Sequence, residues 1–185
     1  MLYSKICFVE SEKLKFIIFN ITLITMLDPK RRLTATLDML FGKGVSSSLP
    51  FDKLDFVYSK RTGKVKHVML DGKILCTFRK DGGIALTMDL ARLLLKEHIF
   101  MEHCIIVGND VARYIVEGRS VFCRHVKYAG SKITVNSEVA VLDENRNIIA
   151  IGKAVLPSCI IRDMKRGVAV KVRESINSSV YSYIE

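Results

Sequence analysis

The stretch at residues 107–126 constrains the fold more than any other part of the chain. In it, a helix signal, a turn signal and a strand signal follow one another without a gap. Asn109 or Asp110 can cap a short helix, and Gly118 can end it, because glycine adopts the left-handed backbone conformation that side chains resist. The apolar residues that follow favour a strand over residues 120–126. The sequence therefore predicts a helix–glycine–strand unit.

Basic side chains surround this unit. Arg113, Arg119 and Arg124 lie within it, and the simplest interpretation is a helix end with solvated arginines. The whole chain, however, has 29 Lys and Arg residues against 19 Asp and Glu residues, which gives a formal net charge of +10. Such an excess favours a polyanionic partner, which means nucleic acid, an anionic membrane surface or an acidic protein.

The sequence from residue 26 onward predicts a small domain of helices and short strands. Asp28 can cap a helix that has Pro29 at its first position and that ends at the glycines near residue 42. Alternating apolar residues predict a strand at 54–58, and the Asp-Gly pair at 71–72 between two apolar runs predicts a hairpin. Two further elements are expected, a helix at 87–96 and a strand at 101–107.

Positive charge is concentrated around this hairpin. Residues 59–80 contain seven Lys or Arg residues, and Asp71 is the one carboxylate among them. Because the residues of a strand alternate between its two faces, part of this charge falls on one face. That face is either a solvated surface or a contact for a ligand. The candidate contacts are Lys60, Arg61, Lys64 and Lys66.

The chain after residue 126 is almost wholly β. A strand is expected at the end of residues 132–142, and a turn at 143–147 leads to a partner strand at 148–156, in which Gly152 favours a bulge. A short helical piece at 160–164 precedes a closing strand at 168–172. On that strand the expected core face carries Val168, Val170 and Val172, and the expected basic face carries Ala169, Lys171 and Arg173.

The spacing of cysteines and histidines gives no candidate metal site. The five cysteines are isolated, without a CxxC pair or a His at ligand spacing, so neither a zinc site nor a disulfide framework is expected. The cysteines in apolar runs are expected to be small buried side chains in a reducing cytoplasm. The four histidines are dispersed and the carboxylates form no predicted pair. The sequence therefore predicts no catalytic residue, metal or cofactor.

The N-terminal part of the chain contains a strongly apolar run. The run FIIFNITLITM at 16–26 is shorter than the roughly 20 residues that a membrane-spanning helix requires, and no signal-peptide pattern is visible, so no membrane association is expected. Three interpretations stay open: an extra element packed on the domain, a hydrophobic arm, and translated sequence upstream of a natural start at Met26. The last two are favoured jointly.

Three segments at residues 105–174 resemble a PUA domain, a small RNA-binding pseudo-barrel: VARYIVEGRSVF, EVAVLDENRNIIAIGKA and KRGVAVKVRE. Upstream, DMLFGKG, YSKRTGKVKHVMLDGKILCTFR and DGGIALT resemble the region that precedes the PUA domain in archaeal archaeosine tRNA-guanine transglycosylases. One departure lies at 135–138, where the family usually has a Gly-Asp turn. The resemblance implies an α+β chain: an unmatched segment (1–25), a small mixed α/β pre-PUA domain (26–102), a PUA-type β pseudo-barrel (103–175) and a tail (176–185).

The resemblance also implies where RNA binds. In PUA domains RNA lies against the helix–glycine–strand corner and the last strand, and in the archaeal transglycosylases the PUA domain grips the acceptor end of tRNA. The family's catalytic (β/α)₈ barrel takes about 250 residues and has no room in this chain. The expected function is thus non-catalytic binding of tRNA. The implied RNA-binding residues are Arg113, Gly118, Arg119, Ser120, Val121, Lys165, Arg166, Gly167, Lys171 and Arg173.

Several functions fit such a chain. It is expected to act in the cytoplasm as an accessory subunit of a separately encoded tRNA-modifying enzyme. The alternative is a ribosome-associated translation factor, because the family of the malignant T-cell amplified and density-regulated proteins also places a domain before a PUA domain. A third interpretation, a protein-interaction module that meets an acidic partner, ranks last because the corner and the closing strand fit RNA better.

Overall fold

The first helix forms where the sequence predicts it. In the computed structural model, which describes residues 28–177, α2 (Pro29–Phe41) begins after Asp28, whose Oδ1 accepts a hydrogen bond of 2.9 Å from the backbone N–H of Lys30. Its apolar face buries Leu33, Leu37 and Phe41. The expectations for residues 1–25 and for most of the tail lie outside the described residues.

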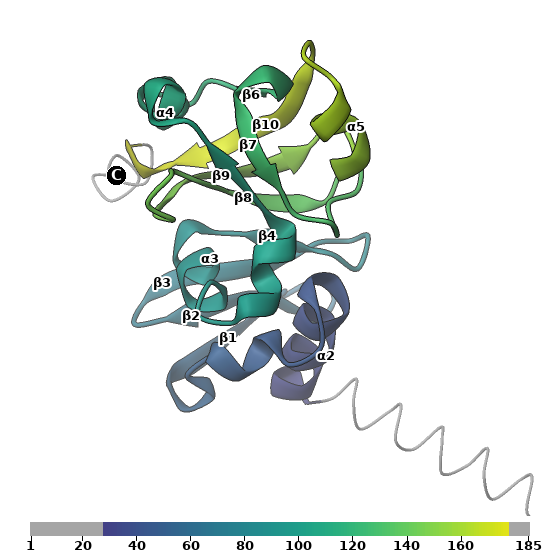
Figure 1. Ribbon diagram of the computed structural model, residues 1–185. Helices are drawn as coiled ribbons and strands as arrows, with labels where there is room; N and C mark the ends of the chain where they lie inside the picture. The colour runs from purple at the N-terminus through teal and green to yellow at the C-terminus, as the bar shows by residue number, and fades with distance from the viewer. Residues whose placement is uncertain (1–27, 178–185) are drawn as a thin grey trace, which may run out of the picture.

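A four-stranded antiparallel sheet follows, in the order β1-β2-β3-β4 (Figure 1). The turn between β2 and β3 has positive φ at both Asp71 (49°) and Gly72 (77°), which is the type I′ geometry that Asp-Gly predicts. The helix α3 (Met88–Leu94) is capped by Thr87, whose Oγ1 accepts from the N–H of Leu90. The remaining elements are the 3-10 turns η1 (Val45–Ser48) and η2 (Phe51–Lys53) and the strands β1 (Leu54–Tyr58), β2 (Val65–Leu70), β3 (Lys73–Phe78) and β4 (Ile84–Leu86).

The second half of the chain forms a nearly closed six-stranded sheet in the order β6-β10-β9-β8-β5-β7. All pairs are antiparallel except β5 with β8. The fold is therefore α+β, as the sequence predicts. Its strands are β5 (Cys104–Val107), β6 (Val121–Phe122), β7 (Val126–Ala129), β8 (Glu138–Leu142), β9 (Ile148–Ala154) and β10 (Val168–Ser175), and its helices are α4 (Asn109–Val116) and α5 (Ser158–Asp163).

Two predicted strands differ in length from the observed ones. The strand expected at 101–107 begins only at Cys104, because the preceding residues form the 3-10 turn η3 (His98–His103). The single strand expected at 120–126 is interrupted by the 3-10 turn η4 (Cys123–His125), which separates β6 from β7. The interruption lets β6 and β7 join opposite edges of the sheet.

The closing strand contains a bulge. On β10, Val172 lies opposite Gly152 and Glu174 lies opposite Ile151, so Arg173 is the extra residue. The expected bulge is thus present at Gly152, but the extra residue belongs to the facing strand. The expected basic face is only partly correct, because Ala169 is fully buried while Lys171 is exposed.

The two sheets share one hydrophobic core. A single cluster of buried side chains includes Leu86 and Leu94 of the first half together with Leu142 and Ile151 of the second half. A second cluster fills the interior of the six-stranded sheet. Figure 1 shows the first sheet and α3 stacked beneath β8 and β9, which is where the shared core lies.

Candidate nucleic-acid interface

Helix α4 ends in a Schellman motif at Gly118. This glycine has φ of 89°, its N–H donates to the carbonyl of Ile115 at 2.9 Å, and the N–H of Arg119 donates to the carbonyl of Tyr114 at 3.1 Å. The glycine therefore ends the helix as predicted. Both N–H groups are already used, so a ligand at this point meets side chains and the open face of Gly118, where a Cβ atom would have no neighbour within 4 Å.

The start of α4 differs from the prediction. The N-cap is Gly108, without a side-chain cap, and Asn109 and Asp110 lie inside the first turn. The Asn109 side chain instead donates from Nδ2 to the Glu144 carboxylate at 2.9 Å, and its Oδ1 accepts from the N–H of Glu144 at 3.4 Å. Asn109 thus joins α4 to the turn between β8 and β9 rather than capping its own helix.

Pairing of β6 with β10 brings two predicted sets of residues together. We call Gly118, Arg119, Ser120 and Val121 the corner, and residues 165–167 the basic loop. Val121 lies opposite Val170, and the carbonyl of Gly167 accepts from the N–H of Cys123 at 3.0 Å. In Figure 1 the loop before β10 reaches the same end of the domain as α4 and β6. The corner and the basic loop therefore form one surface.

A cavity of about 350 Å³ opens at this surface. Two aromatic rings belong to its lining, with 37% of Tyr114 and 44% of Phe122 exposed. Cations lie over the Tyr114 ring, because the guanidinium carbon of Arg113 lies 4.6 Å and that of Arg119 lies 5.5 Å from the ring centre. The full lining comprises Val111, Tyr114, Ile115, Arg119, Ser120, Val121, Phe122, Arg124 and His125.

The cations of this surface are open to a ligand. In the described part of the chain, Arg119 pairs with one carboxylate, Glu117, at 3.8 Å, and both side chains are exposed. Lys165, Arg166 and Lys171 are exposed and form no ion pair with any carboxylate of residues 28–177. A polyanion would find these charges unneutralised.

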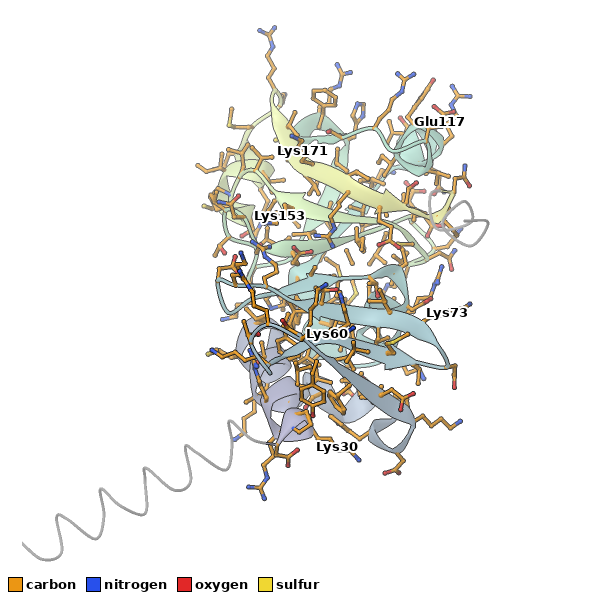
Figure 2. The ribbon with its side chains drawn as sticks, turned by 180° about the vertical axis from the view of Figure 1, so that it is seen from behind. Lys30, Lys60, Lys73, Glu117, Lys153 and Lys171 are labelled. Atoms are coloured by element: carbon orange, nitrogen blue, oxygen red, sulfur yellow. The ribbon has the colours of Figure 1, made fainter. Side chains whose placement is uncertain are left out.

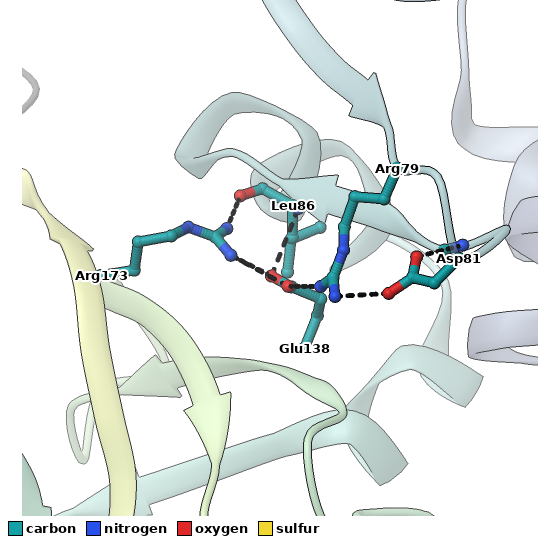
Figure 3. Close-up of polar contacts among 6 residues, drawn as sticks. Arg79, Asp81, Leu86, Glu138 and Arg173 are labelled. Carbon is teal, nitrogen blue, oxygen red and sulfur yellow. Dashed lines mark hydrogen bonds and ion pairs between the residues drawn. The ribbon is translucent and has the colours of Figure 1, made fainter.

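Arg173, also predicted as an RNA contact, is directed elsewhere. Its guanidinium contacts Glu138 and the carbonyl of Leu86, at the junction with the first domain (Figure 3). The guanidinium of Arg173 is thus bound at the domain junction, although Arg173 also lines a cavity of about 280 Å³ together with Gly118 of the corner. Lys171, two residues earlier, is exposed.

The four candidate contacts predicted near the β2–β3 hairpin lie in the first domain. Lys60, Arg61 and Lys64 belong to the exposed loop between β1 and β2, and Lys66 is exposed on β2 between the buried Val65 and the half-buried His67. Figure 2 shows Lys171, Lys153 and Lys60 one below another in the same view of the molecule. Lys153 and Lys171 are direct cross-strand partners.

Several residues that line the cavity were not predicted from the sequence. Tyr114, Phe122 and His125 were not predicted as site residues, and neither was the arginine over the Phe122 ring, Arg124, at 6.0 Å from the ring centre. Their signal is the alternation of arginine with aromatic residues in RYIVEGRSVFCRH. That pattern is typical of surfaces that stack bases.

Three other features of the described part of the chain are its potential metal ligands, the length and apolarity of its helices and the burial of its cysteines. Within residues 28–177, no three His, Cys, Asp or Glu side chains are grouped so as to hold a metal ion. None of the helices described there is long and apolar enough to cross a membrane. Cys76, Cys104 and Cys123 are buried as expected, whereas Cys159 is exposed on α5.

Two family models match different parts of the chain. A family model described as the PUA domain matches residues 103–176, and one described as the patch-forming domain C2 of tRNA-guanine transglycosylase matches residues 31–99. The tRNA-guanine(15) transglycosylase of Methanobrevibacter smithii is 30% identical over 151 residues, which are 80% of this chain and 23% of that protein. That of Picrophilus torridus is 32% identical over 127 residues, 69% of this chain and 20% of that protein.

Solved structures support the fold. A hypothetical protein from Pyrococcus horikoshii OT3 is similar over 84% of this chain and 95% of its own, with a TM-score of 0.65 and 20% sequence identity. The chain spans less than a quarter of the length of the curated relatives it matches, and it spans nearly all of this solved structure.

Proposed function

Because the chain joins a C2 domain of the tRNA-guanine transglycosylase type to a PUA domain, as the archaeal transglycosylases do, we propose that it is a non-catalytic RNA-binding protein. One observation carries the proposal: two half-exposed aromatic rings line a cavity whose lining also includes Arg119 and Arg124, each close to one of the rings. RNA readers favour unpaired nucleotides, whose bases stack on aromatic rings while arginines bind the phosphates.

The proposed mode of binding assigns a role to each group. An unpaired base enters the cavity and stacks on Tyr114 or Phe122. Arg119 and Arg166 bind the flanking phosphates, because a planar guanidinium offers two parallel hydrogen bonds to phosphate oxygens. Phosphate contacts position the RNA, and contacts to the base edge discriminate its sequence.

The proposed ligand is the acceptor end of tRNA, which ends in unpaired nucleotides. The names of the relatives support tRNA as the substrate class. Lys60, Arg61, Lys64 and Lys66 are proposed to extend the contact along the stem. The matched models cover a patch-forming domain and a PUA domain, which supports a role as accessory subunit of a separately encoded tRNA-modifying enzyme. The cytoplasm is the proposed location.

A binding assay with labelled tRNA tests the proposal. Arg119→Glu and Arg166→Glu should each weaken binding by about tenfold or more, since each replaces a phosphate-binding cation by an anion. Affinity should also fall with salt, with a log–log slope of roughly −0.7 to −0.9 per neutralised phosphate.

Lys96→Glu is the matched control, because Lys96 is exposed in the first domain and the substitution changes the charge equally. If Arg119→Glu and Arg166→Glu both bind tRNA as well as Lys96→Glu does, the proposed site is wrong. Trimming the unpaired 3′ nucleotides should weaken the wild type most. Co-sedimentation with small ribosomal subunits, without affinity for free tRNA, would favour a translation factor instead.

A further inference from the structure

A buried carboxylate joins the two domains. Glu138, the first residue of β8, is 7% exposed. Its two oxygens accept hydrogen bonds of 2.9 and 2.7 Å from Nη1 of Arg173, one of 3.3 Å from Nη1 of Arg79 and one of 3.3 Å from the N–H of Leu86. Figure 3 shows the carboxylate between the two guanidinium groups. Arg173 comes from the second domain, whereas Arg79 and Leu86 come from the first.

Each guanidinium has a second partner on the first domain. Arg79 donates from Nη2 to the Asp81 carboxylate at 2.5 Å, and Asp81 also accepts from the N–H of Gly83 at 3.0 Å. These hydrogen bonds, with the one from Gly83 foremost, lower the pKa of Asp81. Arg173 donates from Nη2 to the carbonyl of Leu86. We call Arg79, Asp81, Leu86, Glu138 and Arg173 the domain joint.

The bulge on β10 directs two consecutive residues toward the first domain. In a regular strand, neighbouring side chains point to opposite faces. Arg173 is the unpaired residue of the bulge, and the half-buried carboxylate of Glu174 after it lies near the backbone of Met88, at the start of α3. Burial raises the pKa of Glu174. The bulge thus serves the contact between the domains.

The hydrogen bonds of the domain joint add a fixed geometry to the apolar contact between the two domains. The shared core holds the domains together, but burial of apolar surface is non-directional. Charge-assisted hydrogen bonds to a guanidinium require a fixed geometry. The joint therefore sets the relative position of the two domains, and the core supplies most of the cohesion.

Two lysines that form no ion pair with any carboxylate of residues 28–177 lie beside the joint. Lys153 is the cross-strand partner of both Glu138 and Lys171. Like charges directly opposite each other on a sheet are destabilising, and the Glu138 carboxylate is already bound by the two arginines. A row of positive charge therefore leads from β10 to the joint and, in the view of Figure 2, on toward Lys60.

We propose that Glu138 and Arg173 are positioning residues, which hold the corner and the basic segment 60–66 in one fixed arrangement so that a single RNA molecule contacts both. This inference rests on the proposed RNA-binding function. When two contacts are fixed on one rigid body, the second forms at a high effective concentration, and the overall affinity exceeds that of either contact alone. Arg173 then acts through domain geometry and not as a phosphate ligand.

Two RNAs distinguish positioning from direct contact. The first is a tRNA, which can reach both domains, and the second is a short single strand that occupies only the corner. Glu138→Gln should weaken tRNA binding by about tenfold and change binding of the short strand by less than about twofold. A loss of binding has the opposite sign from the charge effect, since removal of one carboxylate raises the net charge from +10 to +11.

Glu144→Gln supplies the matched control. Glu144 is an exposed glutamate of the same domain, and its carboxylate contacts Lys127 and Asn109 of that domain. This variant should bind both RNAs as tightly as the wild type or more tightly. If Glu138→Gln matches Glu144→Gln on both RNAs, the inference is overturned while the proposed function stands. If the wild type binds neither RNA, the proposed function fails first.

A second pair of variants changes residues of the first domain, one in the domain joint and one beside it. If Glu138→Gln weakens binding of the short strand as well, Arg79→Gln tests whether positioning is the cause. Arg79 binds the same carboxylate but does not belong to the PUA domain. Arg79→Gln should weaken tRNA binding more than Lys80→Gln, which removes an equal charge from the next, exposed residue. Equal effects of these two substitutions would overturn the inference.

Discussion

A Cβ atom on Gly152 would lie 2.3 Å from the carbonyl oxygen of Lys171 on the facing strand. The atom in its way belongs to the backbone of a paired strand and cannot turn aside. We therefore expect Gly152→Ala to lower the free energy of unfolding by about 2 kcal/mol, as overpacking of a well-packed interior does. Urea denaturation measures the loss.

Gly82→Ala is the comparison for this substitution. Gly82 has φ of 84° but nothing within 4 Å of its Cβ position, so only the backbone conformation opposes a side chain there. Gly82→Ala should therefore lower the free energy of unfolding by about 1 kcal/mol. A loss at Gly82 as large as that at Gly152 would show that the close approach of β10 is not what requires glycine.

Phe122→Ala should weaken RNA binding with little change in stability. The ring is 44% exposed in the cavity and faces Arg124, so it is placed to stack on a base. Removal of a stacking ring costs about 1–3 kcal/mol of binding free energy, or roughly fivefold to about 150-fold in affinity. Met39→Ala, which removes a more exposed apolar side chain from α2, should leave the affinity unchanged.

His103 should make the protein less stable in mild acid. Burial, aided by the charge of Lys132 and opposed by that of Glu102, lowers the pKa of His103 below its ordinary value of 6.5. The unfolded chain then binds more protons than the folded one, so stability is complete above pH 6.5 and is lost as the pH falls toward the lowered pKa. Urea midpoints at about pH 7.5 and about pH 5.5 measure this dependence.

The contribution of His103 is isolated by substitution. The imidazole packs edge-on against Phe41, with 5.4 Å between ring centres, so His103→Gln will cost some stability at every pH. Its loss on acidification should nevertheless be smaller than that of the wild type. Substitution of the exposed His98 serves as the control and should retain the wild-type dependence.

The thiols should differ sharply in reactivity. Burial raises the pKa of Cys76 to about 12 and also raises the pKa of Cys104. Cys159 is exposed on α5. In a Cys7→Ser background at about pH 8, an aromatic disulfide reagent should therefore modify Cys159 rapidly and the buried thiols only after denaturation, because the thiolate is the reactive form. A rapid phase that persists after Cys159→Ser would contradict this assignment.

Local chemistry explains why much of the fold was predictable. Asp28 with Pro29, and Asp71 with Gly72, act within a few residues of chain, and their consequences appear in α2 and in the β2–β3 turn. Gly118 ends its helix for the same local reason. Its neighbourhood also identified the corner, because the turn and the arginines are contiguous in sequence.

Long-range contacts explain what was missed. Asn109 does not cap its helix because Glu144, 35 residues away, binds its side chain. The partners of Arg173 could not be predicted, because alternation along a strand is a local rule. The bulge and the hydrogen bonds of its guanidinium depend instead on Gly152, Glu138 and Leu86. The cavity likewise depends on a long-range contact, because the pairing of β6 with β10 is what places Phe122 beside the basic loop.

The core cluster that contains both Leu86 and Ile151 includes residues of both matched regions, so we expect the two regions to unfold together. A cut between the regions matched at 31–99 and 103–176 would leave the apolar face of β8 and β9 in water. The backbone amides of the second sheet should thus owe their protection against hydrogen exchange partly to the first, whatever RNA is present. For this chain, the boundary between two sequence families runs through the middle of one hydrophobic interior.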